Sequence, residues 1–173
     1  MILWAWPGDA LYAPLVGFIT ERIWGAEKPM SDGTVMAVED GGQIIGACLF
    51  HNWQPDEGVI ELTSASLSPR WLSRPVLRAM FGYAFDGLGC QAAVMRVDPA
   101  NTRMCRIASA FGFKRYDIPR LRGRNQAEAL FILGDDEWRA GGFSKENGHG
   151  KALTRTDPAT GNQRSGDRHE RFH

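Results

Sequence analysis

The sequence has few cysteines, no long apolar run and no excess of either charge. Its three cysteines, Cys48, Cys90 and Cys105, have no metal-ligand spacing and cannot all pair, so we expect no metal centre and a reducing compartment. No apolar stretch approaches the roughly 18 residues of a membrane span. The apolar first residues lack the positive start and small-residue cleavage site of a signal peptide. We therefore expect a cytoplasmic protein without a membrane partner.

The chain has 173 residues, 43% of them hydrophobic, with 20 basic residues against 20 acidic ones. This length suits one domain with a proper core, and the neutral balance does not favour nucleic acid as a general partner. The composition changes near residue 141, because residues 141–173 hold six Lys/Arg, four Asp/Glu and few apolar side chains. Such a segment buries too little apolar surface to fold. We expect a domain over residues 1–140 and a disordered polar tail over 141–173.

The spacing of apolar residues predicts the order of the elements. A short opening strand precedes a helix over residues 10–24. The runs TVMAVE, IIGACLFHNW and VIELTSASL, separated by DGGQ and QPDEG, predict an antiparallel meander of three strands. A helix starts near Pro75 and ends near residues 87–89, and the buried strand QAAVMRV follows it. DPAN then opens another helix, and GFKRYDI and AEALFIL form the last strands, joined by the basic loop PRLRGRNQ.

This order combines a meander with a strand–helix–strand crossover, which is right-handed as a rule. It predicts a mixed α/β (α+β) fold, in which helices flank a mostly antiparallel sheet with one central parallel pair. A ligand is expected where the parallel pair begins, outside the C-terminal end of VIELTSASL. There the strand opens directly into a helix, whose N-terminus suits an anion. The connecting residues 68–74 contain two arginines and no glycine.

Two motifs resemble the GNAT acyl-CoA N-acyltransferases. In NTRMCRIASAFGF, Asn101 opens a helix and Gly112 and Phe113 follow eleven and twelve positions later, the spacing found in that family. ALFILGDDEW resembles its closing strand, especially in the branch of ribosomal-protein N-terminal acetyltransferases. The resemblance covers roughly residues 2–138. It implies the GNAT fold, acetyl-CoA as co-substrate and direct acetyl transfer to a primary amine, which is a protein N-terminus, a lysine or a small amine.

The family binds the pyrophosphate of acyl-CoA with a glycine-rich loop, and this sequence departs from it. Pro75 and Leu77 stand at the two glycine positions, and proline has no N–H to donate. Arginines offer charge in place of the missing amides, a departure that resembles small GNAT-like proteins of bacteriophages. An alternative is a degenerate site on a retained fold. The resemblance implies these residues at the cofactor: Leu67, Ser68, Arg70, Arg74, Pro75, Val76, Arg78 and Asn101.

Two residues are candidates for the proton transfers. Glu61 lies fourteen residues before Pro75, an offset resembling that of the general-base glutamate in histone-type members. A carboxylate there accepts a proton from an ammonium, although a solvent-facing or ion-paired strand residue is an equal alternative. The tyrosine that serves as acid in the family is replaced here by Ala108. Tyr116 is taken as the acid, with Tyr83 as the other nearby tyrosine.

A second function is a non-catalytic binding module with the same fold. Four arginines, Arg115, Arg120, Arg122 and Arg124, lie within ten residues, and such a loop engages an acidic protein or nucleic acid. A solvated loop is the plainer interpretation of the same run. The sequence does not indicate an oligomeric state.

Overall fold

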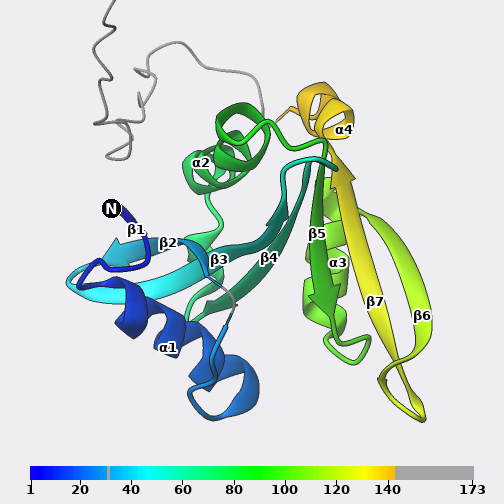
Figure 1. Ribbon diagram of the computed structural model, residues 1–173, viewed down its shortest axis with the longest axis horizontal. Coiled ribbons are helices and arrows are strands. Elements are labelled where there is room, and N and C mark those ends of the chain that lie inside the picture. Colours follow the sequence, from blue (N-terminus) through cyan, green and yellow to red (C-terminus); the bar gives the residue numbers. More distant parts are fainter. Residues whose placement is uncertain (31, 143–173) are drawn as a thin grey trace, which may run out of the picture.

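The computed structural model describes residues 1–30 and 32–142, which fold around a seven-stranded sheet (Figure 1). The strands are β1 (Ile2–Ala5), β2 (Gly33–Asp40), β3 (Gln43–Gln54), β4 (Val59–Ser66), β5 (Ala92–Val97), β6 (Lys114–Gly123) and β7 (Gln126–Gly134). The helices are α1 (Tyr12–Trp24), the 3-10 turn η1 (Pro69–Trp71), α2 (Arg74–Gly82), the π-helical turn η2 (Tyr83–Gly87), α3 (Thr102–Phe111) and α4 (Asp135–Ala140). The expected tail from residue 143 onward lies outside the described residues.

The sheet confirms the predicted fold class. Its strand order is β1-β2-β3-β4-β5-β7-β6, and every neighbouring pair is antiparallel except β4 and β5. The predicted meander is β2, β3 and β4, whose first hairpin turns at Gly41 and Gly42, both with positive φ. Only glycine adopts such angles without strain. The predicted crossover is β4–α2–β5.

Each face of the sheet carries its own apolar core. Strand side chains alternate between faces, so Met36, Cys48 and Leu62 pack against α2 and α3 on one face, while Ala47 and Leu49 pack against α1 on the other. The helix α1 lies across β2, β3 and β4. Among residues 1–30 and 32–142, its main contacts do not extend to β5, β7 and β6, and this difference between the halves of the sheet shapes the site below.

Three elements differ from the sequence-based expectation. The basic stretch PRLRGRNQ is not a loop, because β6 continues through it to Gly123 with a register shift between Ile118 and Gly123. The strand resumes its pairing at Gly123, opposite Gln126, and thus closes the hairpin within the stretch expected to be a loop. The short helix α4 follows β7 directly, with Gly134 N donating to the Glu137 carboxylate at 2.8 Å. The first helix begins at Tyr12 rather than at Ala10.

Among the described residues, no helix is long and apolar enough to cross a membrane. The same residues include no group of three or more His, Cys, Asp or Glu side chains placed to hold a metal ion.

Candidate active site in the opening between β4 and β5

The two parallel strands pair for only four residues and then separate. Their register runs from Val59 opposite Ala92 to Leu62 opposite Met95. Beyond this point β4 keeps its pairing with β3 as far as Ser66, but within the described residues no strand pairs with the edge that faced β5. The separation opens the sheet between its two halves, and it does so at the C-terminal end of the parallel pair, where the sequence predicts a ligand.

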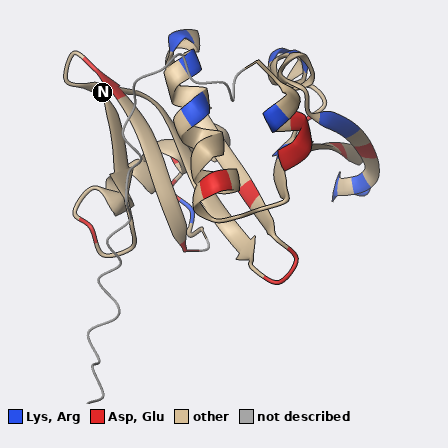
Figure 2. Ribbon diagram, turned by 90° about the horizontal axis from the view of Figure 1, so that it is seen from above, with Lys and Arg blue, Asp and Glu red and all other residues tan. Residues whose placement is uncertain are grey.

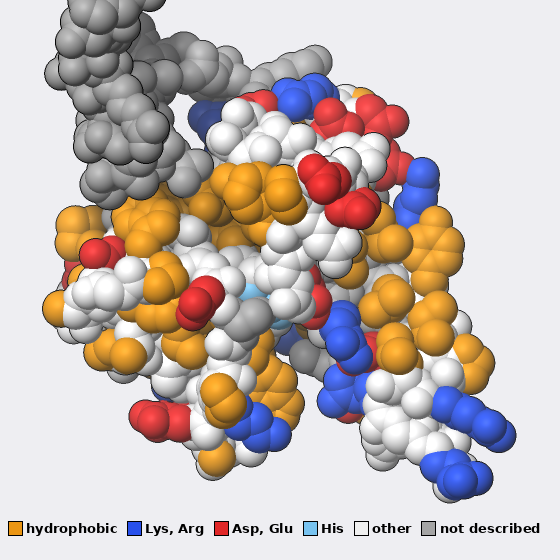
Figure 3. Space-filling view, in the orientation of Figure 1, with side chains coloured by type: hydrophobic (Ala, Val, Ile, Leu, Met, Phe, Trp, Pro, Cys, Tyr) orange, Lys and Arg blue, Asp and Glu red, His pale blue; other side chains and the backbone are white. Residues whose placement is uncertain are grey.

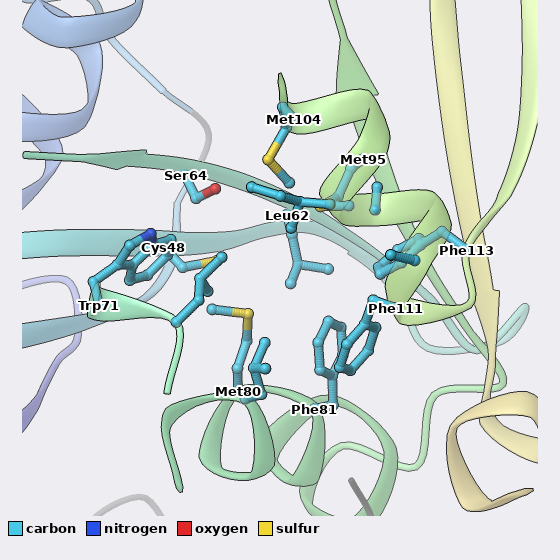
Figure 4. A pocket seen from close by; sticks show the side chains of 15 residues that line it. Cys48, Leu62, Ser64, Trp71, Met80, Phe81, Met95, Met104, Phe111 and Phe113 are labelled. Atoms are coloured by element: carbon cyan, nitrogen blue, oxygen red, sulfur yellow. The ribbon is translucent and has the colours of Figure 1, made fainter. Parts of the chain in front are cut away.

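An apolar pocket of about 340 Å³ lies against this opening, on the face that α2 and α3 cover (Figure 4). Leu62, Ser64 and Met95 form its floor, and Met80, Phe81 and Phe111 stand on its helical walls. The remaining lining residues are Cys48, Trp71, Leu72, Leu77, Met104, Ile107, Ala108, Ala110 and Phe113. The volume is within the range of small-molecule sites, which are mostly apolar with a few polar groups.

Two polar side chains line this pocket, and only one is available for hydrogen bonding. Burial raises the pKa of the Cys48 thiol well above its usual range, so this thiol stays protonated and inert. Ser64 is the remaining hydroxyl. Backbone groups along a strand point alternately to its two edges. Because Leu67 N donates to Ile45 O on the β3 side, the backbone groups of Ser64 and Ser66 are directed to the open edge.

The segment between β4 and α2 is fixed by contacts to β3 and within itself. The amides of Leu67 and Ser68 both donate to Ile45 O, at 2.9 and 3.4 Å, so neither is available to a ligand in the opening. Ser68 Oγ accepts from Arg70 N at 3.3 Å and caps η1. The Trp71 ring is buried over Gly46, where an added Cβ would lie 2.4 Å from a ring atom.

The arginines expected at the cofactor lie along one line of the structure. Arg70, Arg74 and Arg78 follow at four-residue intervals through η1 and α2, and Figure 2 shows basic positions recurring along this helix. Arg70 and Arg74 are exposed and Arg78 is half-buried. Pro75 is exposed in the first turn of α2, whereas Val76 is buried in the core. None of these three arginines lines the pocket itself, but their neighbours Trp71, Leu72 and Leu77 do.

Asn101 lies at the N-terminus of α3, on the other side of the opening. Its Oδ1 accepts a hydrogen bond from Met104 N at 3.1 Å, which makes it the N-cap of α3. Gly112, at the other end, has a φ of 119° and closes the same helix. The Asn-to-Gly-Phe spacing is therefore the length of a capped helix that forms one wall of the pocket.

Glu61 lies on the opposite face from the pocket. Its Oε2 accepts from Asn52 Nδ2 at 2.9 Å, and the register of β3 and β4 places His51 directly opposite Glu61. His51 is buried and its Nε2 bonds Thr63 Oγ1 at 2.8 Å. Burial lowers the pKa of His51, against the opposing effect of the Glu61 carboxylate, so its imidazole is neutral near pH 7. These side chains form a polar group beside the opening.

The two tyrosines considered as acids are remote from Glu61 and the pocket. Tyr116 is half-exposed on the edge strand β6, three strands from β4 and therefore roughly 14 Å from Glu61. The Tyr83 hydroxyl bonds Thr34 Oγ1 at 2.7 Å, and its ring packs against Trp4 and Phe50. The structure therefore does not bring Glu61 and Tyr116 together, and Tyr116 as the acid stays a prediction that its position does not favour.

A buried ion-pair network that the sequence did not reveal lies on the same face as Glu61. Arg96 on β5 and Arg122 on β6 both bond the carboxylate of Glu128 on β7. Figure 3 looks onto this side of the molecule and shows basic and acidic side chains together over the β5–β7 half. No local motif could have found the network, because its members come from three strands that meet only in the folded sheet.

The expected basic binding loop is partly neutralised within its own hairpin. Arg122 is held by Glu128 and Asp98, and Arg115 by Asp117. Two of the four arginines are therefore engaged in ion pairs, which weakens the binding-module alternative.

Comparison with known protein families and solved structures identifies the family of this chain. The family model of the acetyltransferase (GNAT) domain matches residues 12–114. The chain belongs to the GNAT acetyltransferase family. No curated protein matches the sequence. The match includes the residues that line the pocket and the strands β4 and β5 that separate beside it.

Solved structures of the family share the fold. A GCN5-related N-acetyltransferase from Brucella melitensis is 29% identical, with a TM-score of 0.54 over 65% of this chain and 55% of that one. An acetyltransferase structure from T. thermophilus is 20% identical, with a TM-score of 0.54 over 64% of this chain and 62% of that one. A mutant of the spermidine N-acetyltransferase SpeG from Vibrio cholerae is 16% identical, with a TM-score of 0.51 over 61% and 67% of the two chains. The matches thus extend over 55 to 67% of these three relatives.

Proposed function

We propose that this GNAT domain transfers the acetyl group of acetyl-CoA directly to a primary amine. The observation that carries the proposal is the apolar pocket at the opening of β4 and β5, entered beside the N-terminus of α2. The pantetheine arm fits the pocket between α2 and α3, and the backbone groups of Ser64 and Ser66 supply hydrogen bonds at the open edge. The thioester then lies where the sheet opens toward Glu61.

Charge takes the place of glycine at the pyrophosphate. Pro75 removes one of the free backbone amides at the N-terminus of α2. The helix dipole alone stabilises an anion less than a charged side chain does. Arg74, exposed in the first turn of α2, and Arg70, exposed in η1, provide charge-assisted hydrogen bonds, which are about twice as strong as neutral ones. Arg78 lies one turn further along the same helix, and Val76 serves the core rather than the ligand.

Glu61 acts as the general base in this mechanism. It accepts a proton from the ammonium of the acceptor, directly or through water, and leaves a neutral amine. The amine nitrogen attacks the thioester carbonyl carbon, the C–N bond forms, and the C–S bond breaks as CoA leaves as a thiolate. The nitrogen loses its second proton to water as the amide forms, and water protonates the thiolate, because Tyr83 and Tyr116 make their contacts elsewhere. Glu61 releases the first proton to the solvent. The products are the acetylated amine and CoA.

Calorimetric titration with acetyl-CoA, and separately with CoA, tests the binding half of the proposal. We expect a Kd in the micromolar range, on the order of −8 kcal/mol. Arg74→Ala should weaken it about tenfold or more, since a hydrogen bond to a charged group contributes roughly 1.5–3 kcal/mol. Arg22→Ala is the matched control, because Arg22 lies over the Phe18 ring on α1, away from the pocket. A wild-type protein that binds neither compound would sink the proposal.

A further inference from the structure

A buried carboxylate fixes two guanidinium groups on the face of the sheet that carries Glu61. The Glu128 side chain is 4% exposed, and its Oε2 accepts from Arg96 Nε at 2.9 Å and Nη2 at 2.7 Å. Its Oε1 accepts from Arg122 Nη1 at 3.2 Å. A carboxylate buried to this extent is stable only when it is paired. Glu128 therefore holds both arginines in fixed orientations, and the entropy of ordering them is lost on folding rather than on ligand binding.

Arg96 and Arg122 differ in what they present to the solvent. Arg122 Nη2 lies 3.5 Å from Asp98 Oδ2, so this arginine has a carboxylate on each side. The Arg96 side chain is 46% exposed, and within residues 1–30 and 32–142 Glu128 is its only carboxylate partner. The bond to Glu128 raises the pKa of Arg96 further above its usual range. Arg96 thus keeps a full positive charge with an open outer edge.

Arg96 lies on β5 at the opening between β4 and β5. Met95 is the last residue of β5 that pairs with β4, so Arg96 is the first residue beyond the point where the strands separate. Strand alternation places it on the opposite face from Met95 and the pocket, the face of Glu61 and Thr63. Glu61 pairs with Val94, and Arg96 follows two residues later on the same face, so the two backbone positions lie roughly 7–8 Å apart. A cation and a carboxylate therefore flank the acceptor side of the opening.

We propose that Arg96 binds an anionic group of the acceptor, so that the acceptor class is amines with a carboxylate a few ångströms from the nitrogen, such as free α-amino acids. The inference rests on the proposed function. In this arrangement the ammonium approaches Glu61 while the carboxylate meets the outer edge of the Arg96 guanidinium, whose planar fork suits a carboxylate. A polyamine would instead place a second cation beside Arg96, which is unfavourable.

Matched acceptors test the assignment. Initial rates of acetylation are measured with acetyl-CoA and each of the standard amino acids, its amide and its decarboxylated amine, together with spermidine. At least one amino acid should be acetylated with a kcat/KM about 10- to 100-fold above that of its own amide, the range that follows from one hydrogen-bonded ion pair. Decarboxylated amines and spermidine should be acetylated with a kcat/KM no higher than that of the amides.

Variants of Arg96 separate binding from folding. Arg96→Gln should raise KM for the amino acid until the kcat/KM values of the acid and of its amide lie within about threefold of each other. Arg96→Lys keeps the positive charge and should recover part of the preference for the amino acid over its amide. Arg115→Gln is the control, since this exposed arginine bonds Asp117 and lies near the Phe131 ring on the other face, and it should keep the full preference. Urea denaturation confirms that each variant is folded.

The outcomes distinguish this inference from the proposed function. Equal rates for acids and amides, a preference for spermidine, or an Arg96→Gln variant that keeps the preference would each overturn it. If acetyl-CoA binds and Arg74→Ala weakens that binding, yet no compound of the panel is acetylated, the amino-acid assignment fails and the acetyl-CoA site stands. If acetyl-CoA does not bind at all, both fall together.

Discussion

At the scale of single residues, contacts across the sheet decide what each polar side chain does. Glu61 shows this most clearly, because a carboxylate on a meander strand has no evident partner in the sequence. In the fold it is bonded by Asn52, whose φ of 49° is left-handed, an angle that asparagine tolerates better than most residues. The offset of Glu61 from Pro75 was readable from the sequence, but the partners that orient its carboxylate were not.

His51 should make stability depend on pH. Burial lowers its folded-state pKa below the ordinary 6.5, so as pH falls below about 6.5 the unfolded chain gains a proton that the folded protein does not take up. The free energy of unfolding should therefore decrease between that value and the lower, folded-state pKa. Urea denaturation at pH 7.5 and 5.5 measures it, and His51→Gln should lose less stability over the interval than the wild type.

The wild type and the His51→Gln variant differ in only one titrating group. The other three histidines, at positions 149, 169 and 173, remain in both proteins, so the difference between the two pH dependences belongs to His51. Equal losses in wild type and variant would show that His51 ionises alike in the folded and unfolded states.

Gly46 should be intolerant of even one methyl group. A Cβ there would lie 2.4–2.6 Å from atoms of the Trp71 ring, and a buried indole has no space to give way. Gly46→Ala should reduce the free energy of unfolding by about 1–3 kcal/mol and loosen the pocket wall that Trp71 forms, which weakens acetyl-CoA binding. Gly82→Ala is the control, since Gly82 has a helical φ of −61° and nothing within 4 Å of the added Cβ. A Gly46→Ala variant as stable as the wild type would contradict this packing.

At the scale of helices and strands, the sequence predicted those elements whose formation depends on interactions between residues close in the chain. The Asp-Gly-Gly turn fixed the β2–β3 hairpin and the apolar periodicity located α1, α2 and α3. The extension of β6 to Gly123 was missed because the strand continues past its register shift through residues whose composition is typical of loops. The ion-pair network was missed because Arg96, Glu128 and Arg122 become neighbours only through the β5-β7-β6 order.

The N-cap of α3 gives a prediction at this scale. Asn101→Ala removes the hydrogen bond from Met104 N and should reduce the free energy of unfolding by about 1 kcal/mol, as measured by urea denaturation. Asn101→Ser keeps a capping oxygen and should restore most of that stability. An alanine variant with unchanged stability would rule out the cap.

The same pair of variants tests the expected cofactor contact of Asn101. If its amide also reaches the pantetheine arm, the serine variant should recover stability while its acetyl-CoA affinity stays low. If the serine variant recovers both stability and acetyl-CoA affinity, helix capping alone explains the role of Asn101.

At the scale of the whole molecule, the opening divides the sheet into two halves that a ligand would join. The halves are linked by four residue pairs between β4 and β5 and by the shared core under α2 and α3. The pocket takes Leu62 and Trp71 from one half and Met95 and Phe113 from the other. A ligand between them makes contacts that exist only when both halves are folded together, so its binding energy should appear in global unfolding.

Acetyl-CoA should therefore raise the Tm of the intact chain. At a concentration 100 times Kd the stabilisation is about 2.7 kcal/mol, which for a chain of this size corresponds to roughly 5–11 °C. Arg74→Ala, with an affinity about tenfold lower, should show about half the stabilisation at the same concentration, because the effect grows as the logarithm of the ratio of ligand to Kd. Thermal denaturation followed by circular dichroism measures both, with Arg22→Ala expected to behave as the wild type. An unchanged Tm at a concentration that saturates binding in calorimetry would mean that the ligand binds the unfolded chain equally well, and a pocket formed jointly by the two halves could not be its site.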